Sequence, residues 1–544
     1  MNPFLNKEAV NKEALNLRDT QKDFAVFLPS ISAIYAKIVS MPEYNVRDTL
    51  PAGLNNSRSD LDFLNSNNNL MYYPAALYSA GHAYLNTGDS DIQESMVQKR
   101  DRSRTVMLGD SGGFQIATGV LKWPWTKKKD QDDLSWNQDK DKIRLQILHW
   151  LEHTADYSMV LDVPTYGLVK FGFDPVTGES LHPGMKTFAD CLKVSLDNYD
   201  FFIRNRKEGA TKFLNVLQGR NEAEGDIWWD AVKDLPFETW AFSNVQASNF
   251  AINLRRLIIM RDGQYLDDCD WLHYLGNGKI KAGCALTTLQ RNIRKYINDK
   301  ITISFDAASP FVMTAKGQMY YGYELSYDNM KFKGGSIVDD KSLKNNNMTI
   351  NDWVVANDRK GFIVPTRIGS KCTVGDICVR GYEDLDFKKI PFSKKELESE
   401  WYKSTPEGRV GDKFKWSEDY KTYLAHSNNN GGLFNFGVKT FDKEHEKYQV
   451  KWPSSMDGFS YLIAMHHNVE IHIRAIQEAC EWQDKPLHEA NQRVTADLLE
   501  FKDLCPDILT SERPMDIINK HEKLLRNITG MDADNSIKLS LEDI

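Results

Sequence analysis

The chain has 544 residues, of which 41% are hydrophobic and 26% charged. That length suffices for one large domain with appendages or for two to three domains. No apolar stretch approaches the ~20 residues of a membrane-spanning helix, the N-terminus lacks the apolar core of a signal peptide, and the seven cysteines are scattered. We therefore expect a cytoplasmic protein (in the host cytoplasm if viral) that does not contact membranes.

The formal net charge is −8, whereas proteins that bind nucleic acid through bulk charge are usually basic. Binding to a polynucleotide would therefore need a local basic surface. The alternative for each basic cluster is an ordinary solvated face. The candidate clusters are Lys127-Lys128-Lys129, Arg255-Arg256, Lys388-Lys389 and Lys394-Lys395.

Eight short apolar runs follow one another along the first 306 residues, several of them separated by segments with helical periodicity. Near-continuous apolar runs of this length are typical of strands that are buried on both faces of a parallel sheet. Eight alternations of strand and helix predict an α/β protein with an eight-stranded TIM-type barrel. The predicted strands are Phe24–Pro29, Leu70–Ser79, Thr105–Asp110, Tyr157–Pro164, Phe213–Gly219, Thr239–Val245, Trp271–Gly276 and Ile301–Asp306.

The sequence after the eighth run changes in character. We expect residues 1–328 to form the catalytic barrel and residues 329–456, rich in Lys, Asn, Gly and Asp, to form an insertion or accessory domain. Residues 457–544 are predicted to add C-terminal helices and a polar tail. The first of these helices, Tyr461–Trp482, has the periodicity of a helix that returns to complete the barrel.

Polar residues occur at the carboxyl ends of five predicted strands. In a parallel barrel these ends meet at one mouth, where the active site lies. Helix capping is the alternative explanation, and it accounts for one or two of the positions better than for all of them. The residues are Asp110, Asp162, Gln218, Ser243 with Asn244, and Asp306.

The sharpest local motif is the segment 110–115, DSGGFQ, which directly follows a predicted strand. Its glycines allow the backbone to approach a flat ligand closely. Asp110 can accept hydrogen bonds from the edge of a nucleobase, and Phe114 can stack on its face. On its own the motif is also compatible with a simple turn.

The DSGGFQ motif resembles the signature of the tRNA-guanine transglycosylase superfamily, and other segments resemble that family in the same order. They are FAVFLPS, VLDVP, VLQG, HYLGNG and ISFDAASP. The resemblance covers residues 21 to 320 and returns near residues 461 to 480. It implies that Asp306 is the nucleophile and Asp110 the general acid and base. The candidate base-binding residues are Ser111, Gly112, Phe114, Asp162, Gln218, Gly219, Asn244 and Gly276.

Base exchange at a sugar carbon agrees with these residue types. Retention of the anomer needs two inversions, so a carboxylate such as Asp306 first forms a covalent glycosyl-enzyme intermediate. Asp110 would protonate the departing guanine and deprotonate the incoming base. Asp162 and Gln218 would hold the polar edge of the base, which must leave its stack to reach a barrel mouth. No organic cofactor is required.

Two departures from the family pattern favour DNA over tRNA as the substrate. Ser243-Asn244-Val245 stands where the family has Gly-Gly-Leu, and ASPF follows the nucleophile where the family has PTR, whose arginine acts on tRNA. Together with the long insertion, these features look more like the DNA-directed (DpdA-type) 7-deazaguanine transglycosylases of phages and bacteria. The expected partners are DNA, a free base such as a cyano- or aminomethyl-deazaguanine, and by family analogy a second copy in a homodimer.

Three alternatives remain open at this point. One is a tRNA-guanine transglycosylase that acts on tRNA. Another is a non-catalytic nucleic-acid-binding paralogue, against which the retention of Asp110 and Asp306 argues. The third is an ordinary retaining glycosidase on the same barrel, which would not exchange free guanine.

The family's structural Zn²⁺ site is only partly matched. Cys372 and Cys378 remain of the cysteine cluster, and the resemblance makes His467 the matching histidine. His426 or Asp376 would supply the fourth ligand. The alternative is two free cysteines and a helical histidine that bonds a backbone carbonyl.

Overall fold

The computed structural model describes residues 24–40, 52–54, 58–68, 70–315, 317–336, 343, 346–357, 364–377, 439–442, 447–450 and 458–529. Several residues predicted to have a role lie outside these ranges. They are Cys378, His426, Lys388-Lys389 and Lys394-Lys395.

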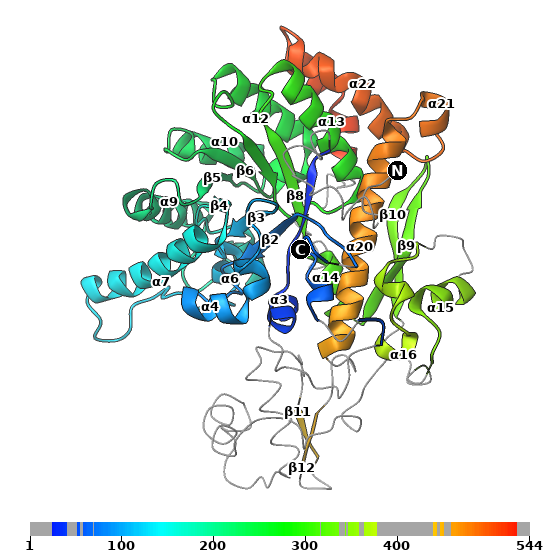
Figure 1. Cartoon of the computed structure of the whole chain (residues 1–544). Helices are drawn as coiled ribbons and strands as arrows, with labels where there is room; N and C mark the ends of the chain where they lie inside the picture. Colours follow the sequence, from blue (N-terminus) through cyan, green and yellow to red (C-terminus); the bar gives the residue numbers. More distant parts are fainter. Residues whose placement is uncertain are drawn as a thin grey trace.

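Eight parallel strands form a nearly closed barrel in the order β1-β8-β7-β6-β5-β4-β3-β2 (Figure 1). A parallel bridge between Ser30 and Leu77 links β1 to β2 at the remaining seam, where the Ile31 amide donates to the Leu77 carbonyl at 2.9 Å. The strands are β1 (Val26–Pro29), β2 (Ala75–Ser79), β3 (Val106–Asp110), β4 (Tyr157–Met159), β5 (Lys212–Leu217), β6 (Thr239–Phe242), β7 (Trp271–Tyr274) and β8 (Thr302–Ala307).

The barrel predicted from the sequence is confirmed, and each of the eight apolar runs contains one strand. The strands β4 to β7 end before their runs, because the last residues of these runs continue into the loops at the mouth, whereas β1, β2 and β3 begin after the start of theirs. The fourth run is the clearest case: β4 ends at Met159, and residues 160–164 stay buried outside the strand. Apart from Asp162 these residues are apolar and buried, which hydrophobic pattern alone cannot separate from strand pairing.

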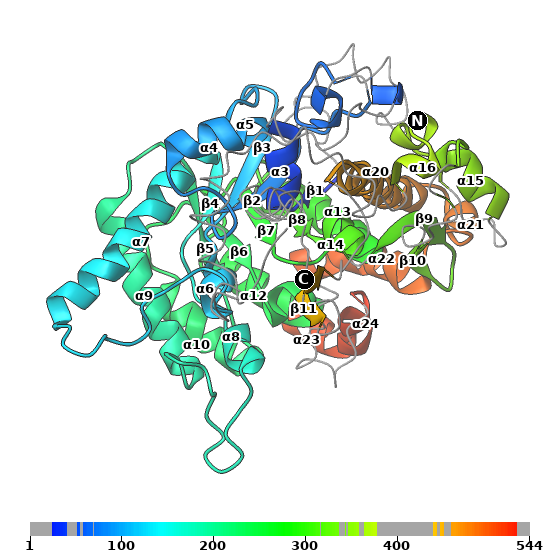
Figure 2. The same cartoon turned by 90° about the horizontal axis from the view of Figure 1, so that it is seen from below.

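Helices surround the barrel (Figures 1 and 2), and several begin at side-chain caps. Helix α7 begins at Asp133, because Asp132 caps it by accepting from the Ser135 amide. These helices are α3 (Ala33–Ser40), α4 (Thr87–Gln93), α5 (Ser95–Gln98), α6 (Gly113–Ala117), α7 (Asp133–Thr154), α8 (Tyr166–Lys170), α9 (Phe188–Asn205), α10 (Glu222–Val232), α11 (Val245–Ser248), α12 (Phe250–Asp262), α13 (Ile280–Tyr296) and α14 (Ser309–Ala315).

A long helix, α20 (Gly458–Gln483), takes the place of the helix that follows β8. It packs against α13 and α3, and Figures 1 and 2 show it between the barrel and the antiparallel hairpin of β9 (Gln318–Leu325) and β10 (Met330–Ser336). Its side chains from 462 to 480 are almost all buried because protein covers it on both sides. The helical C-terminal region predicted from the sequence is thus present, and its first helix completes the ring.

The remaining described elements flank this core. Helices that follow α20 pack on α12 and α13, where Lys281 pairs with Asp497 and Arg291 pairs with Asp484. No helix in the described ranges is long and apolar enough to cross a membrane. The elements are α15 (Ile350–Asn357), α16 (Val374–Ile377), β11 (Lys439–Asp442), β12 (Lys447–Val450), α21 (Leu487–Ala490), α22 (Ala496–Thr510), α23 (Pro514–Lys520) and α24 (Glu522–Asn527), with short 3-10 turns at Ala52–Leu54, Arg58–Leu61 and Ile368–Ser370.

Candidate active site

Three carboxylates from different strands meet at the carboxyl end of the barrel. Asp110 is the last residue of β3, Asp306 lies in β8, and Asp162 follows β4. Burial raises the pKa of both Asp110 and Asp162, and a smaller contribution comes from the charge of Asp306 in the first case and of Asp110 in the second. The predicted strand-end carboxylates therefore belong to one electrostatically coupled group, as expected of an active site.

Asp306 is held by donors on both of its oxygens. The Ser30 hydroxyl donates to Oδ2 at 2.6 Å, and the Gly276 amide donates to Oδ1 at 2.7 Å. The His273 Nε2 lies 3.4 Å from the same Oδ1. Asp306 is 8% exposed, so a carboxylate fixed in one orientation lies at a nearly buried position, as a nucleophile requires.

Asp110 has the environment of a carboxyl group that can hold a proton. Burial raises its pKa above the usual 3.8, and the charge of Asp306 adds to this. Two hydrogen bonds oppose the shift: the Ser79 hydroxyl donates to Oδ2 at 2.5 Å, and the Gly112 amide also donates. A raised pKa beside a carboxylate is the arrangement by which one acid donates a proton while its neighbour stays charged.

A hydrogen-bonded chain runs from Asp162 along the mouth. The Gln218 Nε2 donates to Asp162 Oδ2 at 2.5 Å, and the Asn244 Nδ2 donates to the Gln218 Oε1 and to the Thr165 hydroxyl. Burial raises the pKa of Asp162 to about 7, although the Gln218 bond lowers it. The Gln218 bond is made to one of the two carboxylate oxygens, Oδ2.

Asn244 has a strained backbone, with φ 50° and ψ −130°. This left-handed conformation favours glycine and costs other residues about 1–3 kcal/mol. The strained position carries a side-chain amide that orients Gln218.

Glycines allow two close approaches at the mouth. A Cβ on Gly113 would lie 1.8 Å from the carbonyl oxygen of Asp162, and one on Gly112 would lie 2.6 Å from the Gly81 nitrogen. Gly112 has φ 82° and Gly276 has φ 67°. Gly219, at φ 140°, lets α10 approach the end of β5, because a Cβ there would meet the Gly225 backbone.

The other two residues predicted to bind the base have different surroundings. Phe114 stacks on Tyr166, with ring centroids 5.4 Å apart and an interplanar angle of 28°. Ser111 is fully buried, and its hydroxyl donates to the Val160 carbonyl at 3.2 Å. Phe114 therefore belongs to an aromatic pair beside the carboxylates, whereas Ser111 faces the protein interior.

Sequence reasoning did not single out four residues of this site: Ser30, Ser79, Tyr166 and His273. Both serines follow the rule used for the carboxylates, because Ser79 ends β2 and Ser30 directly follows β1. Tyr166 stands four residues after Asp162, as the first residue of α8. His273 lies inside β7, where nothing in the sequence distinguishes it from a packed histidine.

The described residues do not fit a zinc site at His467. Its Nε2 faces the Tyr320 carbonyl at 2.8 Å and must donate there, so its Nδ1 accepts from the Thr366 hydroxyl at 2.6 Å. Both nitrogens are engaged, and zinc binding would require breaking one of these bonds. Cys372 is buried, and Asp376 accepts from Thr373. Within the described ranges no cluster of three or more metal-ligating side chains occurs.

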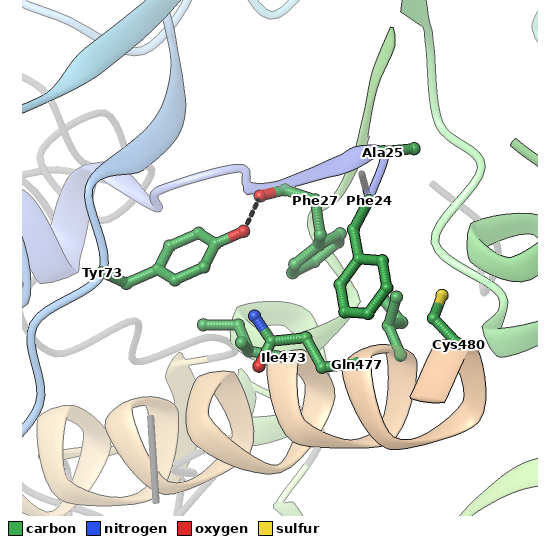
Figure 3. A pocket seen from close by; sticks show the side chains of 8 residues that line it. Phe24, Ala25, Phe27, Tyr73, Ile473, Gln477 and Cys480 are labelled. Atoms are coloured by element: carbon green, nitrogen blue, oxygen red, sulfur yellow. Dashed lines mark hydrogen bonds between the residues drawn. The ribbon is translucent and has the colours of Figure 1, made fainter. Parts of the chain in front are cut away.

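A small cavity lies away from the carboxylates, between the start of β1 and α20 (Figure 3). The Tyr73 hydroxyl closes one side by donating to the Phe27 carbonyl at 2.5 Å. Its lining is mostly apolar and carries no carboxylate, so it lacks the groups for acid-base chemistry. The lining residues are Phe24, Ala25, Phe27, Tyr73, Ile473, Ile476, Gln477 and Cys480.

Acidic side chains partner both basic clusters that the structure describes. Arg255 pairs with Glu222 and Glu522, and Arg256 pairs with Asp226. In the other cluster Lys127 pairs with Asp133 and Lys128 with Asp139, all at exposed positions. Exposed pairs of this kind contribute about 0–1 kcal/mol, so the lysines of residues 127–129 stay accessible to a polyanion.

Comparison of the sequence with protein-family models and with curated proteins gave no match.

Proposed function

We propose that this protein exchanges guanine in DNA for a 7-deazaguanine through a covalent glycosyl-enzyme intermediate. The observation that carries the proposal is the pair of Asp306, held by donors on both oxygens, and Asp110, whose pKa is raised beside it. This is the pairing of nucleophile and proton donor that a two-step exchange at a sugar carbon needs.

In the first step a carboxylate oxygen of Asp306 forms a bond to the sugar C1′ as the C1′–N9 bond breaks. The electron pair of that bond stays on the departing guanine, which takes a proton from Asp110. In the second step Asp110 removes the N9 proton of the incoming base, and N9 bonds to C1′. The electron pair of the broken ester bond returns to Asp306, which completes the cycle without an outside reagent.

The chain from Asn244 through Gln218 to Asp162 supports binding of a guanine-like edge. Gln218 uses its amide nitrogen on Asp162, so the other carboxylate oxygen can accept from the N–H groups of a base. Phe114 and Tyr166 provide an aromatic surface for its face. A buried polar site of this kind discriminates against bases that leave its groups unpaired.

The segment after the nucleophile supports DNA rather than tRNA. Ser309 and Pro310 begin α14, and the Pro310 carbonyl accepts from the Asn468 amide of α20 at 3.0 Å. The segment that in the resembling family presents an arginine to tRNA is here packed against a helix. Duplex DNA would reach the mouth with its target nucleotide turned out of the stack.

The test is incorporation of labelled base into nucleic acid. Purified protein is incubated with labelled guanine, and separately with labelled cyano- and aminomethyl-deazaguanines, in the presence of duplex DNA or bulk tRNA. We expect label in DNA and a covalent protein–DNA adduct on denaturing gels. Asp306→Ala should abolish both, whereas Asp270→Ala, at the opposite end of β7, should retain both.

The outcomes separate the alternatives. Label in tRNA alone would overturn the choice of DNA. An adduct that releases sugar to water without taking up any base would indicate a retaining glycosidase. Failure of every base with both nucleic acids, together with retained DNA binding, would indicate a non-catalytic binding protein.

A further inference from the structure

We propose that His273 is a positioning residue, held as its neutral Nε2–H tautomer with that proton directed at the nucleophile Asp306. The inference rests on the proposed function, since it assigns a partner to the same nucleophile. Its basis is a chain of contacts between β7 and β8, which pair in register at His273 and Ser304.

The first link fixes the hydroxyl of Ser304. The Trp271 indole N–H can only donate, and it donates to the Ser304 Oγ at 2.7 Å. The same Oγ lies 2.8 Å from the His273 Nδ1. Among the bonds of the described residues, Nδ1 is the acceptor that the proton of Ser304 can reach, so Nδ1 carries the lone pair.

The second link concerns which nitrogen of the His273 ring carries the proton. An imidazole that accepts at Nδ1 carries its proton at Nε2 when it is neutral. The His273 ring is fully buried, and its Nε2 has no hydrogen-bond partner among the residues that the structure describes, while Oδ1 of Asp306 lies 3.4 Å away. With the other tautomer, an unshared pair of Nε2 would face the carboxylate. Both links therefore place the proton toward Asp306.

The His273 Nε2–H contributes to the second half of the exchange. When the ester between Asp306 and the sugar breaks, the negative charge returns to the carboxylate. The Gly276 amide already donates to Oδ1 at 2.7 Å, and the His273 Nε2–H faces the same oxygen, so both stabilise that charge. The contact distance of 3.4 Å leaves room to shorten as the charge develops.

The test combines a spectroscopic and a kinetic readout. Protein with ¹⁵N-labelled histidine is studied by long-range ¹H–¹⁵N correlation, and His273 is assigned by its loss in His273→Gln. We expect a proton on Nε2 and none on Nδ1. Ser304→Ala should remove this preference, and Trp271→Phe, which leaves the proton of Ser304 free to donate, should keep it. A proton on Nδ1 in the wild-type protein would overturn the inference.

The kinetic arm compares His273→Leu, which has no donor, with His273→Gln, whose side-chain amide can donate near the same position. We expect His273→Leu to lower kcat by about 100-fold with less than a threefold change in KM for the base, and His273→Gln to recover at least tenfold of that loss. Equal kcat in both variants would overturn the role. If the wild-type protein itself exchanges no base, the proposed function fails, while the tautomer measurement still decides the geometry.

Discussion

Two sets of buried titratable side chains lie in different parts of this molecule. At the barrel mouth, burial raises the pKa of Asp110 and Asp162. Along α20, burial lowers the pKa of His466 and His472 to about 3 and that of His467 to about 4. In both sets the environment favours the neutral form, because removing a charge from water is costly.

The two sets differ in what surrounds them. His472 stacks between Phe27 and Phe332 and bonds the Gly278 carbonyl, so a neutral ring satisfies its neighbours. Asp110 has a second carboxylate, Asp306, beside it. A neutral side chain at position 110 would therefore make the folded state more stable. The three histidines of this helix are thus neutral groups that serve packing, whereas the mouth retains charges that destabilise the fold, which is typical of functional sites.

Asp110→Asn tests the mouth most directly. It should lower base exchange by about 10³-fold, because the departing base loses its proton donor. The same change should raise the melting temperature, since it removes a buried acid that repels Asp306. Exchange rates and thermal denaturation measure the two effects. Asp270→Asn, which breaks the pair with Lys212 at the opposite end of the barrel, should do neither. A loss of activity together with a loss of stability would contradict the view that the charges at the mouth destabilise the fold.

Asp162→Asn tests how much the buried charge of Asp162 lowers the stability of the fold. Between pH 3.8 and 7 the folded protein keeps a proton on Asp162 that the unfolded chain has released, so stability falls as pH rises through this window and stays lower above it. We expect the variant to be more stable than the wild type by about 4 kcal/mol at pH 8, and by less as pH falls toward 4, because each pH unit between the two pKa values contributes about 1.4 kcal/mol. Urea denaturation at several pH values measures this, and a pH-independent difference would contradict it.

His472→Phe tests how the buried neutral histidine of α20 affects stability at different pH values. The unfolded chain takes up a proton at His472 below pH 6.5, while the folded protein resists until about pH 3, so stability is lost as pH falls below 6.5. Phenylalanine keeps the stacking but loses the bond to Gly278. Relative to the wild type, the variant should therefore gain about 2 kcal/mol between pH 8 and pH 4.5. Ile476→Val, a buried change on the same helix that removes no titratable group, provides the control, since its effect on stability should be the same at both pH values.

The sequence predicts the barrel well because its strands are apolar on both faces and polar residues follow them at one end. That pattern identifies Asp110, Asp162 and Asp306 without any coordinates. It does not identify His273, because a histidine inside a strand gives the same pattern whether it packs or faces a carboxylate. Nor does it predict that both nitrogens of His467 are bonded, since those partners come from segments 101 and 147 residues away.

Asn244→Gly addresses the smallest difference between the two regions, the strain stored in the backbone of the mouth. Glycine adopts φ 50° without a steric penalty, but it also increases the entropy of the unfolded chain. The relief of about 1–3 kcal/mol exceeds that entropic cost, so the variant should be more stable by about 1 kcal/mol. Asn249→Gly, at an ordinary φ of −109°, is the matched control and should be less stable than the wild type.

The same variant should weaken binding of the base, because Gln218 loses the amide that fixes its orientation toward Asp162. Calorimetric titration with the free base measures this separately from turnover. Higher stability together with weaker binding would show that Asn244 destabilises the fold but holds Gln218 in the orientation that binds the base. If Asn244→Gly were instead less stable, with unchanged affinity, the strain would have no part in the site, and the contrast between mouth and helix would rest on the carboxylates alone.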